Sequence, residues 1–272
     1  MYRGEFFWLC AAFVLMIQYA VQSCFGGLVD MKFDVTIDHL NCAHWRMDIG
    51  KVNAFSKEAV SSLDDLLSDC VSMFPDKIRV LSIESDKISP NHKPIFSAGA
   101  DQKERTNWSK EAILSHVENQ RRIIHRFREV PFWVVCCVDG LALGLGAEMC
   151  LAADFVLASP QARFGFPEKS LGIIPGAGGY TWAHHLAKDL DYAQRLIETG
   201  EWIDADHAEY VGIVDSCCDA EDFEDEVSAL AFQLLGMTPE DQIAHKKKRL
   251  EKIDYKSLFE VEQSRYGESL KR

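Results

Sequence analysis

A seven-residue apolar run followed closely by glycines is the feature that most constrains the fold of this chain. Residues 132–138 read FWVVCCV and contain no charged side chain. A strand without a polar face has to be covered on both sides, as in parallel sheets enclosed by helices. Gly140, Gly144 and Gly146 follow, and then an apolar segment, 147–153, that we expect to be helical. The pattern predicts a buried sheet with helices against both faces, an α/β fold.

Segments on both sides of this run alternate between strand-like and helix-like patterns. Ser56 is a suitable N-cap for a helix that ends before Pro75, and a second helix is expected from Ser109 to about Arg128. We expect further strands at 33–37, 78–83 and 155–158, then a mainly helical region after Pro175 with a last strand at 212–214.

The composition restricts the classes of function. Asp and Glu number 42 against 29 Lys and Arg, giving a formal charge of -13, which argues against nucleic-acid binding. The nine cysteines show no CxxC pair and no zinc-site spacing with histidine, so we expect free thiols in a reducing cytoplasm and no metal. The basic cluster Lys246-Lys247-Lys248-Arg249 is expected to be a solvated helix face.

Residues 1–30 form an apolar leader whose status the sequence leaves open. Phe6 to Ile17 is an unbroken apolar run, shorter than the roughly 20 residues that span a bilayer. It is interpreted as an upstream extension of a chain that begins at Met31, as a membrane anchor, or as a secretory signal without a typical cleavage site. The expected location is cytoplasmic, or membrane-associated if the leader is an anchor.

Two isolated acids stand in stretches that are rich in glycine and alanine. Glu148 is the only acid in residues 140–153, and Glu168 lies alone in the stretch 164–179, which is rich in proline and glycine. Two carboxyls in separate apolar surroundings are expected to have raised or separated pKa values, the arrangement that lets one act as base and the other as acid. A third stretch, SAGAD at 97–101, has side chains small enough for a ligand to approach the backbone. Each stretch alone also has an ordinary structural explanation, as a turn or a helix start.

Taken together and in order, these stretches resemble the crotonase superfamily, the enoyl-CoA hydratase and isomerase group. The resemblance covers roughly residues 33 to 265, and its parts are NAF at 53–55, FSAGAD at 96–101, GLALGLGAE at 140–148, FPEKSLGIIPGAGG at 166–179, GEWIDA at 200–205 and GIVD at 212–215. It implies a spiral core of ββα turns over 31–198 and a helical C-terminal region over 199–272, expected to mediate assembly into homotrimers or hexamers. It also implies an acyl-CoA thioester substrate, fatty acid metabolism, and no cofactor beyond the CoA that the substrate carries.

The resemblance also assigns roles to residues. The backbone amides of Ala100 and Leu145 would form an oxyanion hole for a thioester enolate, and the backbone of residues 98–101 (Ala98, Gly99, Ala100 and Asp101) would bind the adenine end of CoA. Glu148 and Glu168 match the two glutamates that hold the attacking water and protonate the α-carbon in the hydratases. An enoyl-CoA hydratase is therefore the expected activity.

Leu145 departs from the family pattern, which commonly has three successive glycines where this chain has Gly144-Leu145-Gly146. Its side chain is expected to restrict φ and to narrow the acyl pocket. Two alternatives stay open: a double-bond isomerase, which can work with the position of Glu168 alone, and a catalytically weak acyl-CoA-binding homologue. A serine hydrolase is disfavoured because no G-x-S-x-G motif occurs.

Overall fold

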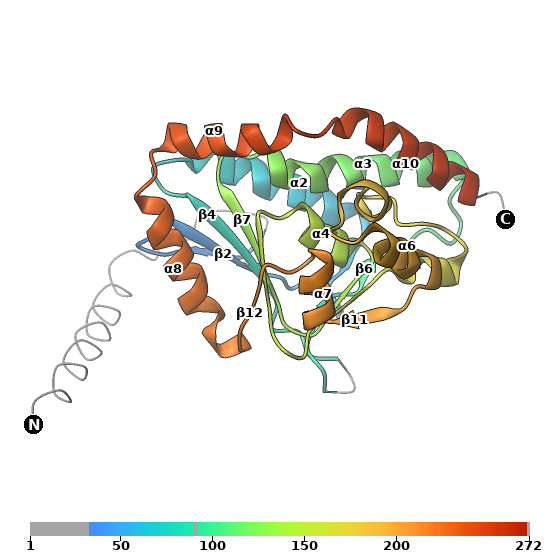
Figure 1. The fold of residues 1–272 in the computed structure, drawn as a ribbon, viewed down its shortest axis with the longest axis horizontal. Coiled ribbons are helices and arrows are strands. Elements are labelled where there is room, and N and C mark those ends of the chain that lie inside the picture. The colour runs from blue at the N-terminus through green and yellow to red at the C-terminus, as the bar shows by residue number, and fades with distance from the viewer. Residues whose placement is uncertain (1–32, 90–91, 271–272) are drawn as a thin grey trace, which may run out of the picture.

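A central sheet enclosed by helices dominates the computed structural model, which describes residues 33–89 and 92–270 (Figure 1). Within this part of the chain the sheet has six strands in the order β1-β2-β4-β7-β9-β12. Only β1 and β2 pair antiparallel, and every other neighbouring pair is parallel. Its strands are β1 (Val35–Ile37), β2 (Cys42–Arg46), β4 (Val80–Glu84), β7 (Trp133–Val138), β9 (Phe155–Ala158) and β12 (Ser216–Cys217).

The apolar run of β7 is buried on both faces, which confirms the expectation from its sequence. Val134, Cys136 and Val138 belong to the main core, whereas Trp133 and Val135 alternate into a second core on the other face. Helix α8 (Phe223–Leu235) covers that second face, and α2 (Lys57–Met73) and α3 (Lys110–Glu129) pack on the main core. A sheet of this kind needs no polar face.

The two long helices begin where the sequence predicts. The side chains of Ser56 and Ser109 accept hydrogen bonds from the amides of Ala59 and Ala112, so each serine satisfies one of the amides left open at a helix start. Helices α9 (Pro239–Leu250) and α10 (Tyr255–Ser269) run across α2 and α3 as an outer layer (Figure 1). The region after residue 198 is thus mainly helical, as expected.

Two smaller sheets lie beside the large one. The described residues form a four-stranded sheet in the order β11-β10-β8-β5 and a two-stranded sheet of β3 and β6. Their strands are β3 (Ala54–Phe55), β5 (Ile95–Ser97), β6 (Gly99–Ala100), β8 (Leu141–Leu143), β10 (Arg163–Gly165) and β11 (Trp202–Asp204). Short helical segments complete the fold: α4 (Leu145–Ala152), η1 (Pro167–Leu171), α5 (Gly179–Thr181), η2 (Trp182–Leu186), α6 (Leu190–Thr199), α7 (Ala205–Val211) and η3 (Ala220–Asp222).

The last strand lies later than predicted. Residues 212–214 form no strand, because Gly212 ends helix α7 with a left-handed φ of 86°. The strand is β12, where Ser216 and Cys217 pair with Leu157 and Ala158 of β9. The position of this strand is determined by pairing with β9 and not by the apolar residues at 212–214. Strands β10 and β11 were not predicted either.

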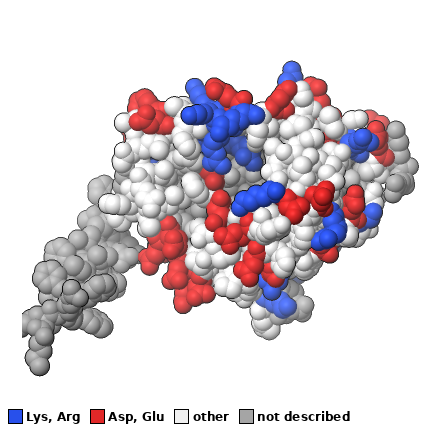
Figure 2. Space-filling model, viewed as in Figure 1, with Lys and Arg blue, Asp and Glu red and all other residues white. Residues whose placement is uncertain are grey.

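The leader lies outside the described residues. Among the residues that the structure describes, no helix is long and apolar enough to cross a membrane. The seven cysteines in this part of the chain are free thiols. Charged side chains follow the helix dipoles, with acids gathered at the start of α8 and basic residues near the end of α9 (Figure 2).

The basic cluster of α9 is only partly solvated, so the prediction of a solvated face is wrong for Lys246. This side chain is 3% exposed, and its ammonium donates to the carboxylate of Asp154 at 2.7 Å and to the carbonyls of Phe127 and Phe132 at 2.7–2.8 Å. Asp154 also accepts from the amide of Val134. A buried ion pair with every charge hydrogen-bonded therefore ties α9 to the main sheet.

Replacing Lys246 by alanine is expected to lower the free energy of unfolding by about 3 kcal/mol, because Asp154 would lose its buried partner and keep only the more exposed Arg249 at 3.1 Å. Urea denaturation measures this. The exposed neighbour Lys247 provides the control, since its replacement by alanine is expected to stay within about 0.5 kcal/mol of the wild type. Equal effects at the two positions would contradict the assignment.

Candidate active site

The start of helix α4 forms one wall of the candidate site. Leu145 is its first residue, so its amide is one of those that a helix leaves without an intrahelical acceptor. The unusual backbone conformation falls on Gly144, with a φ of 52°. Leucine therefore occupies an ordinary helical position, and the expected restriction of φ does not strain it. Its side chain is 2% exposed and packs in the main core while also lining the cavity.

Glu148 follows one turn later in α4 and is 3% exposed. Its Oε1 accepts hydrogen bonds from the amides of Ala177 at 2.7 Å and Gly179 at 3.0 Å. The glycine-rich segment around residue 178 thus fixes the carboxyl from the opposite side. A methyl group on Gly179 would lie 3.1 Å from the same oxygen, so glycine allows this close approach.

Glu168 lies on η1, which runs from Pro167 to Leu171 and is capped by Gly172. A Cβ on Gly144 would lie 2.6 Å from its Oε1, so the carboxyl sits directly over the turn that precedes the Leu145 amide. Its Oε2 is buried and has no hydrogen-bond partner in the described part of the chain. This oxygen is free to exchange a proton with a bound molecule.

One cavity brings four of the predicted residues together. Ala100, Leu145, Glu148 and Glu168 all line it, although they come from β6, α4 and η1. The space left free between its walls is about 20 Å³, room for about one water molecule. The sequence prediction that these residues share one site is consistent with this geometry, and their roles remain proposals.

Of the remaining predicted residues, Gly99 begins strand β6, and Ala98 and Asp101 flank that strand. Ala98 is exposed, and its amide donates to the carbonyl of Val52. Gly99 has a φ of 92°, and a Cβ there would lie 2.6 Å from the carbonyl oxygen of Leu143. The carboxylate of Asp101 accepts from the amide of Lys103, so it closes the following turn. None of the three lines the cavity itself.

Both carboxyls have raised pKa values. Burial raises the pKa of Glu148 above its ordinary value of 4.5, the charges of Glu168 and Glu262 raise it further, and the amides of Gly179 and Ala177 oppose the shift. Burial also raises the pKa of Glu168, while its own backbone and the charge of Arg105 act against the shift. Two carboxyls that interact in one site titrate as a coupled pair, so the ionisation of one raises the pKa of the other.

Several polar residues of the site were not predicted from the sequence, among them Gln102, which lines the cavity. Arg105, Gln120 and Tyr266 line the cavity, and Glu262 is fully buried behind it. Gln120 belongs to α3, and Glu262 and Tyr266 lie four residues apart on α10. The available signal was polar side chains at helical spacing among apolar ones, which is too common to single out a site.

Glu262 binds the same segment, residues 177–181, whose amides donate hydrogen bonds to Glu148. Its carboxylate accepts from the amides of Gly178 at 2.8 Å and Thr181 at 2.9 Å, from the hydroxyl of Thr181 at 2.6 Å, and from Arg121 at 3.2 Å. Helix α10 is therefore connected to the site through the buried carboxylate of Glu262, which accepts hydrogen bonds from backbone and side-chain donors of the protein.

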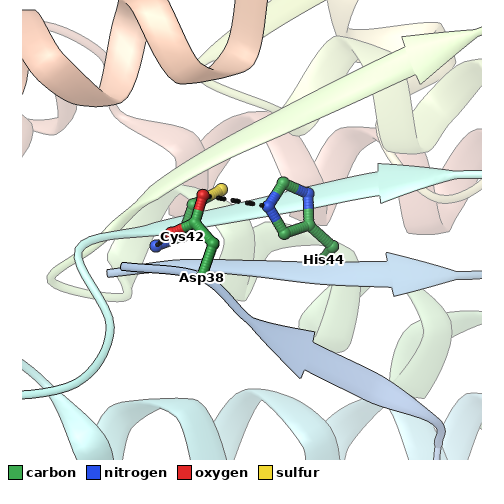
Figure 3. A group of neighbouring side chains, drawn as sticks. All are labelled: Asp38, Cys42 and His44. Carbon is green, nitrogen blue, oxygen red and sulfur yellow. Dashed lines mark hydrogen bonds and ion pairs between the residues drawn. The ribbon is translucent and has the colours of Figure 1, made fainter. Parts of the chain in front are cut away.

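A second group of polar side chains, Asp38, Cys42 and His44, lies at the β1–β2 turn (Figure 3). Asp38 accepts from the amides of Leu40 and Cys42 and lies 3.3 Å from the Nε2 of His44. Burial opposes protonation of His44, but hydrogen bonds to Asp38 and its other neighbours raise its pKa to about 12. A charged pair that closes a turn accounts for this group.

With the fold and the site established, comparison with known proteins identifies the class. The family model for enoyl-CoA hydratase/isomerase matches residues 45–265, so this chain belongs to that family, within the crotonase superfamily. The resemblance seen in the sequence is confirmed, and so is the α/β fold with a helical C-terminal region. Crotonase-family proteins act on acyl-CoA thioesters. The family that matches this chain consists of hydratases, which are lyases, and of isomerases.

Individual relatives share 34–38% of their residues with this chain over the matched stretches. The enoyl-CoA isomerase/hydratase fer4 of Mycosarcoma maydis is 38% identical over 123 residues, 45% of this chain and 44% of that protein. The probable mitochondrial enoyl-CoA hydratase 2 of Arabidopsis thaliana is 34% identical over 183 residues, 67% and 58% of the two chains. The mitochondrial methylglutaconyl-CoA hydratase of Homo sapiens is 34% identical over 169 residues, 61% and 48% of the two. The matches thus span about half the length of these curated relatives.

Solved structures agree on the fold. The enoyl-CoA hydratase from Bacillus anthracis superposes with a TM-score of 0.71 at 25% identity, covering 85% of this chain and 89% of that one. A probable enoyl-CoA hydratase from Mycobacterium smegmatis gives a TM-score of 0.74 at 22% identity, covering 87% and 93%.

The raised pKa values predict how stability depends on pH. Because the folded protein keeps protons that the unfolded chain has lost, these carboxyls make stability fall as pH rises from about 4.5 through their raised pKa values. The double variant Glu148→Gln, Glu168→Gln removes this contribution and is expected to show a flatter dependence between about pH 5 and about pH 8. Urea midpoints measure the difference in slope.

The exposed Glu118 of α3 supplies the control, and Glu118→Gln is expected to keep the wild-type slope. If the double variant also kept it, the two carboxyls would have ordinary pKa values and the buried pair would be wrong.

Proposed function

We propose that this protein is an enoyl-CoA hydratase that adds water across the 2,3-double bond of an acyl-CoA thioester. The observation that carries the proposal is that both glutamates line one cavity together with Ala100 and Leu145, the two residues whose amides the family resemblance assigns to an oxyanion hole. A hydratase needs two proton-handling groups, and this cavity retains both.

The first requirement is an acceptor for negative charge. When water attacks C3, the electron pair of the double bond moves toward the thioester oxygen and forms an enolate. The amides of Ala100 and Leu145 are proposed to donate to that oxygen, and the loss of one such donor typically costs about 3–4 kcal/mol of transition-state stabilisation. The helix start at Leu145 adds the positive end of the α4 dipole.

The second requirement is a base for the water. Glu148 is proposed to take a proton from water as its oxygen bonds to C3. Its Oε1 is held by two amides, so the carboxyl has a fixed orientation and its other oxygen is left for the water. Orientation of this kind lowers the barrier because the reacting groups are placed before the step begins.

The third requirement is an acid for C2. Glu168 is proposed to deliver its proton to C2 as the enolate collapses back to the thioester, so that one water is consumed and the hydroxyl remains on C3. Its Oε2 has no hydrogen-bond partner among the described residues, so this oxygen is the one proposed to carry the proton. Transfer of the proton gained by Glu148 to Glu168 through water restores the starting state.

A second candidate, a double-bond isomerase, is favoured by the difference between the two carboxyls. Glu148 is bound by two amides, whereas the Oε2 of Glu168 is unpartnered, so Glu168 alone can move a proton between C2 and C4. One of the relatives carries both activities in its name. The hydratase is preferred because an isomerase has no need for the second carboxyl.

Hydration of crotonyl-CoA, followed by loss of absorbance of the conjugated thioester, tests the proposal. Glu148→Gln and Glu168→Gln are each expected to lower kcat about 100- to 10,000-fold, because each removes one proton transfer. Glu118→Gln is expected to match the wild type. Loss of activity in Glu168→Gln alone, with 3-enoyl-CoA as the better substrate, would replace the hydratase by the isomerase. Binding of CoA esters without any turnover would indicate an inactive homologue.

A glycine variant tests the placement of Glu168 without changing either carboxyl. In Gly144→Ala the new Cβ would stand 2.6 Å from the Oε1 of Glu168, and displacement of the carboxyl is expected to lower kcat about 100-fold. Gly50→Ala carries a similar left-handed φ, 60°, with no atom within 4 Å of the new Cβ. It shares the positive φ without the contact to Glu168 and is expected to keep wild-type kcat. Equal activity in both variants would show that Glu168 does not act from this position.

A further inference from the structure

The cavity beside the two glutamates contains a buried cation without an acid partner. Arg105 is 8% exposed, and its guanidinium donates to the side-chain oxygen of Gln120 at 2.9 Å. No carboxylate of the described residues lies within ion-pair distance of it. A buried charge is costly unless a counter-charge or strong acceptors surround it. Glu168 is near enough for the charge of Arg105 to lower its pKa but forms no ion pair with it, so the guanidinium is left to bind an anionic ligand.

Two donors in this cavity also lack acceptors. The Nε of Arg105 and the side-chain nitrogen of Gln120 are buried and have no hydrogen-bond partner within the described chain. Both residues are more than nine-tenths buried and both line the cavity that holds Glu148 and Glu168. Folded proteins leave few buried donors unpaired, so two in one cavity indicate a ligand with acceptor oxygens.

The chemistry of the donors narrows the ligand. A planar guanidinium presents parallel N–H groups that match the two oxygens of a carboxylate, and a neighbouring amide can supply a further bond. The positive charge reaches its neighbours, because Arg105 acts to lower the pKa of Glu168 and of the Tyr266 phenol against the effect of burial. An entirely apolar acyl chain would leave both donors unpaired and the charge uncompensated.

We propose that the acyl group of the substrate ends in a carboxylate, so that the substrate is the mono-CoA thioester of an unsaturated dicarboxylic acid, and that Arg105 and Gln120 bind its free carboxylate. This inference rests on the proposed function, since it places the thioester at the Ala100 and Leu145 amides and the double bond between the two glutamates. Arg105 then selects the substrate and takes no part in the proton transfers.

Binding measurements test this without requiring turnover. Isothermal titration calorimetry compares the saturated mono-CoA thioesters of four-, five- and six-carbon dicarboxylic acids with the CoA thioesters of the monocarboxylic acids of equal length. At one of these lengths the dicarboxylic ester is expected to bind about 10- to 100-fold more tightly, the effect of a hydrogen-bonded charge on a buried carboxylate. All probes share the CoA part, so its phosphates cannot produce the difference.

Variants assign the preference to the named residues. Arg105→Met is expected to reduce the ratio of the two affinities to one or less, Arg105→Lys to keep part of it, and Gln120→Leu to reduce it by several-fold. Arg122→Met is the matched control, because Arg122 lies exposed on α3 and pairs with Asp64. It is expected to leave the ratio unchanged. Thermal unfolding of each variant confirms that it is folded. If Arg105→Met does not fold, Gln120→Leu replaces it as the test of the carboxylate site.

The outcomes separate this inference from the proposed function. Equal binding of the two series by the wild type overturns it, and so does an equal loss of both series in Arg105→Met, which would place the arginine at CoA or beside Glu168 only. Failure to bind either series also overturns it. Hydration of crotonyl-CoA without a preference for a dicarboxylic ester would leave the hydratase standing and refute the inference alone. A retained preference without hydration of either crotonyl-CoA or the unsaturated dicarboxylic ester of the preferred length would refute the hydratase alone.

Discussion

The segment from Ala177 to Thr181 is the structural element on which the rest of the site depends. Its amides alternate between two buried carboxylates, with Ala177 and Gly179 donating to Glu148 and Gly178 and Thr181 donating to Glu262. One short turn therefore orients the proposed base from one side and anchors helix α10 from the other. Loss of this turn would release Glu148 and separate α10, with Tyr266, from the cavity that the helix helps to close.

The same arrangement explains why two carboxyls can remain partly protonated in a well-packed protein. Burial and mutual repulsion disfavour ionisation of the pair, while two amides at Glu148 and the charge of Arg105 near Glu168 keep the cost moderate. Glu262 adds a further negative charge but is paired with Arg121. The effects that raise and lower the two pKa values are thus opposed, and a charged substrate bound in the cavity can change which carboxyl holds the proton.

The sequence predicted the parts of this protein whose information is local. Helix starts at Ser56 and Ser109, the doubly buried strand β7 and the two isolated glutamates could all be recognised from neighbouring residues. The order of the motifs supplied the family. Features set by distant partners escaped, because no local pattern reports them. Lys246 was predicted to be solvated because its partner Asp154 lies 92 residues away, and the position of β12 is set by pairing with β9 and not by apolar residues. Arg105, Gln120 and Tyr266 become a group only when α3 and α10 pack around one cavity.

The central claim is that Glu148 and Glu168 share protons at neutral pH inside one cavity, and infrared difference spectroscopy of carboxyl protonation measures this most directly. The wild type is expected to show a protonated carboxyl signal at about pH 7, and Glu148→Gln and Glu168→Gln are each expected to alter this signal or its titration. Glu118→Gln should leave it unchanged. A wild type in which every carboxyl titrates near its ordinary value of 4.5 would contradict the account, because neither glutamate could then serve as the acid.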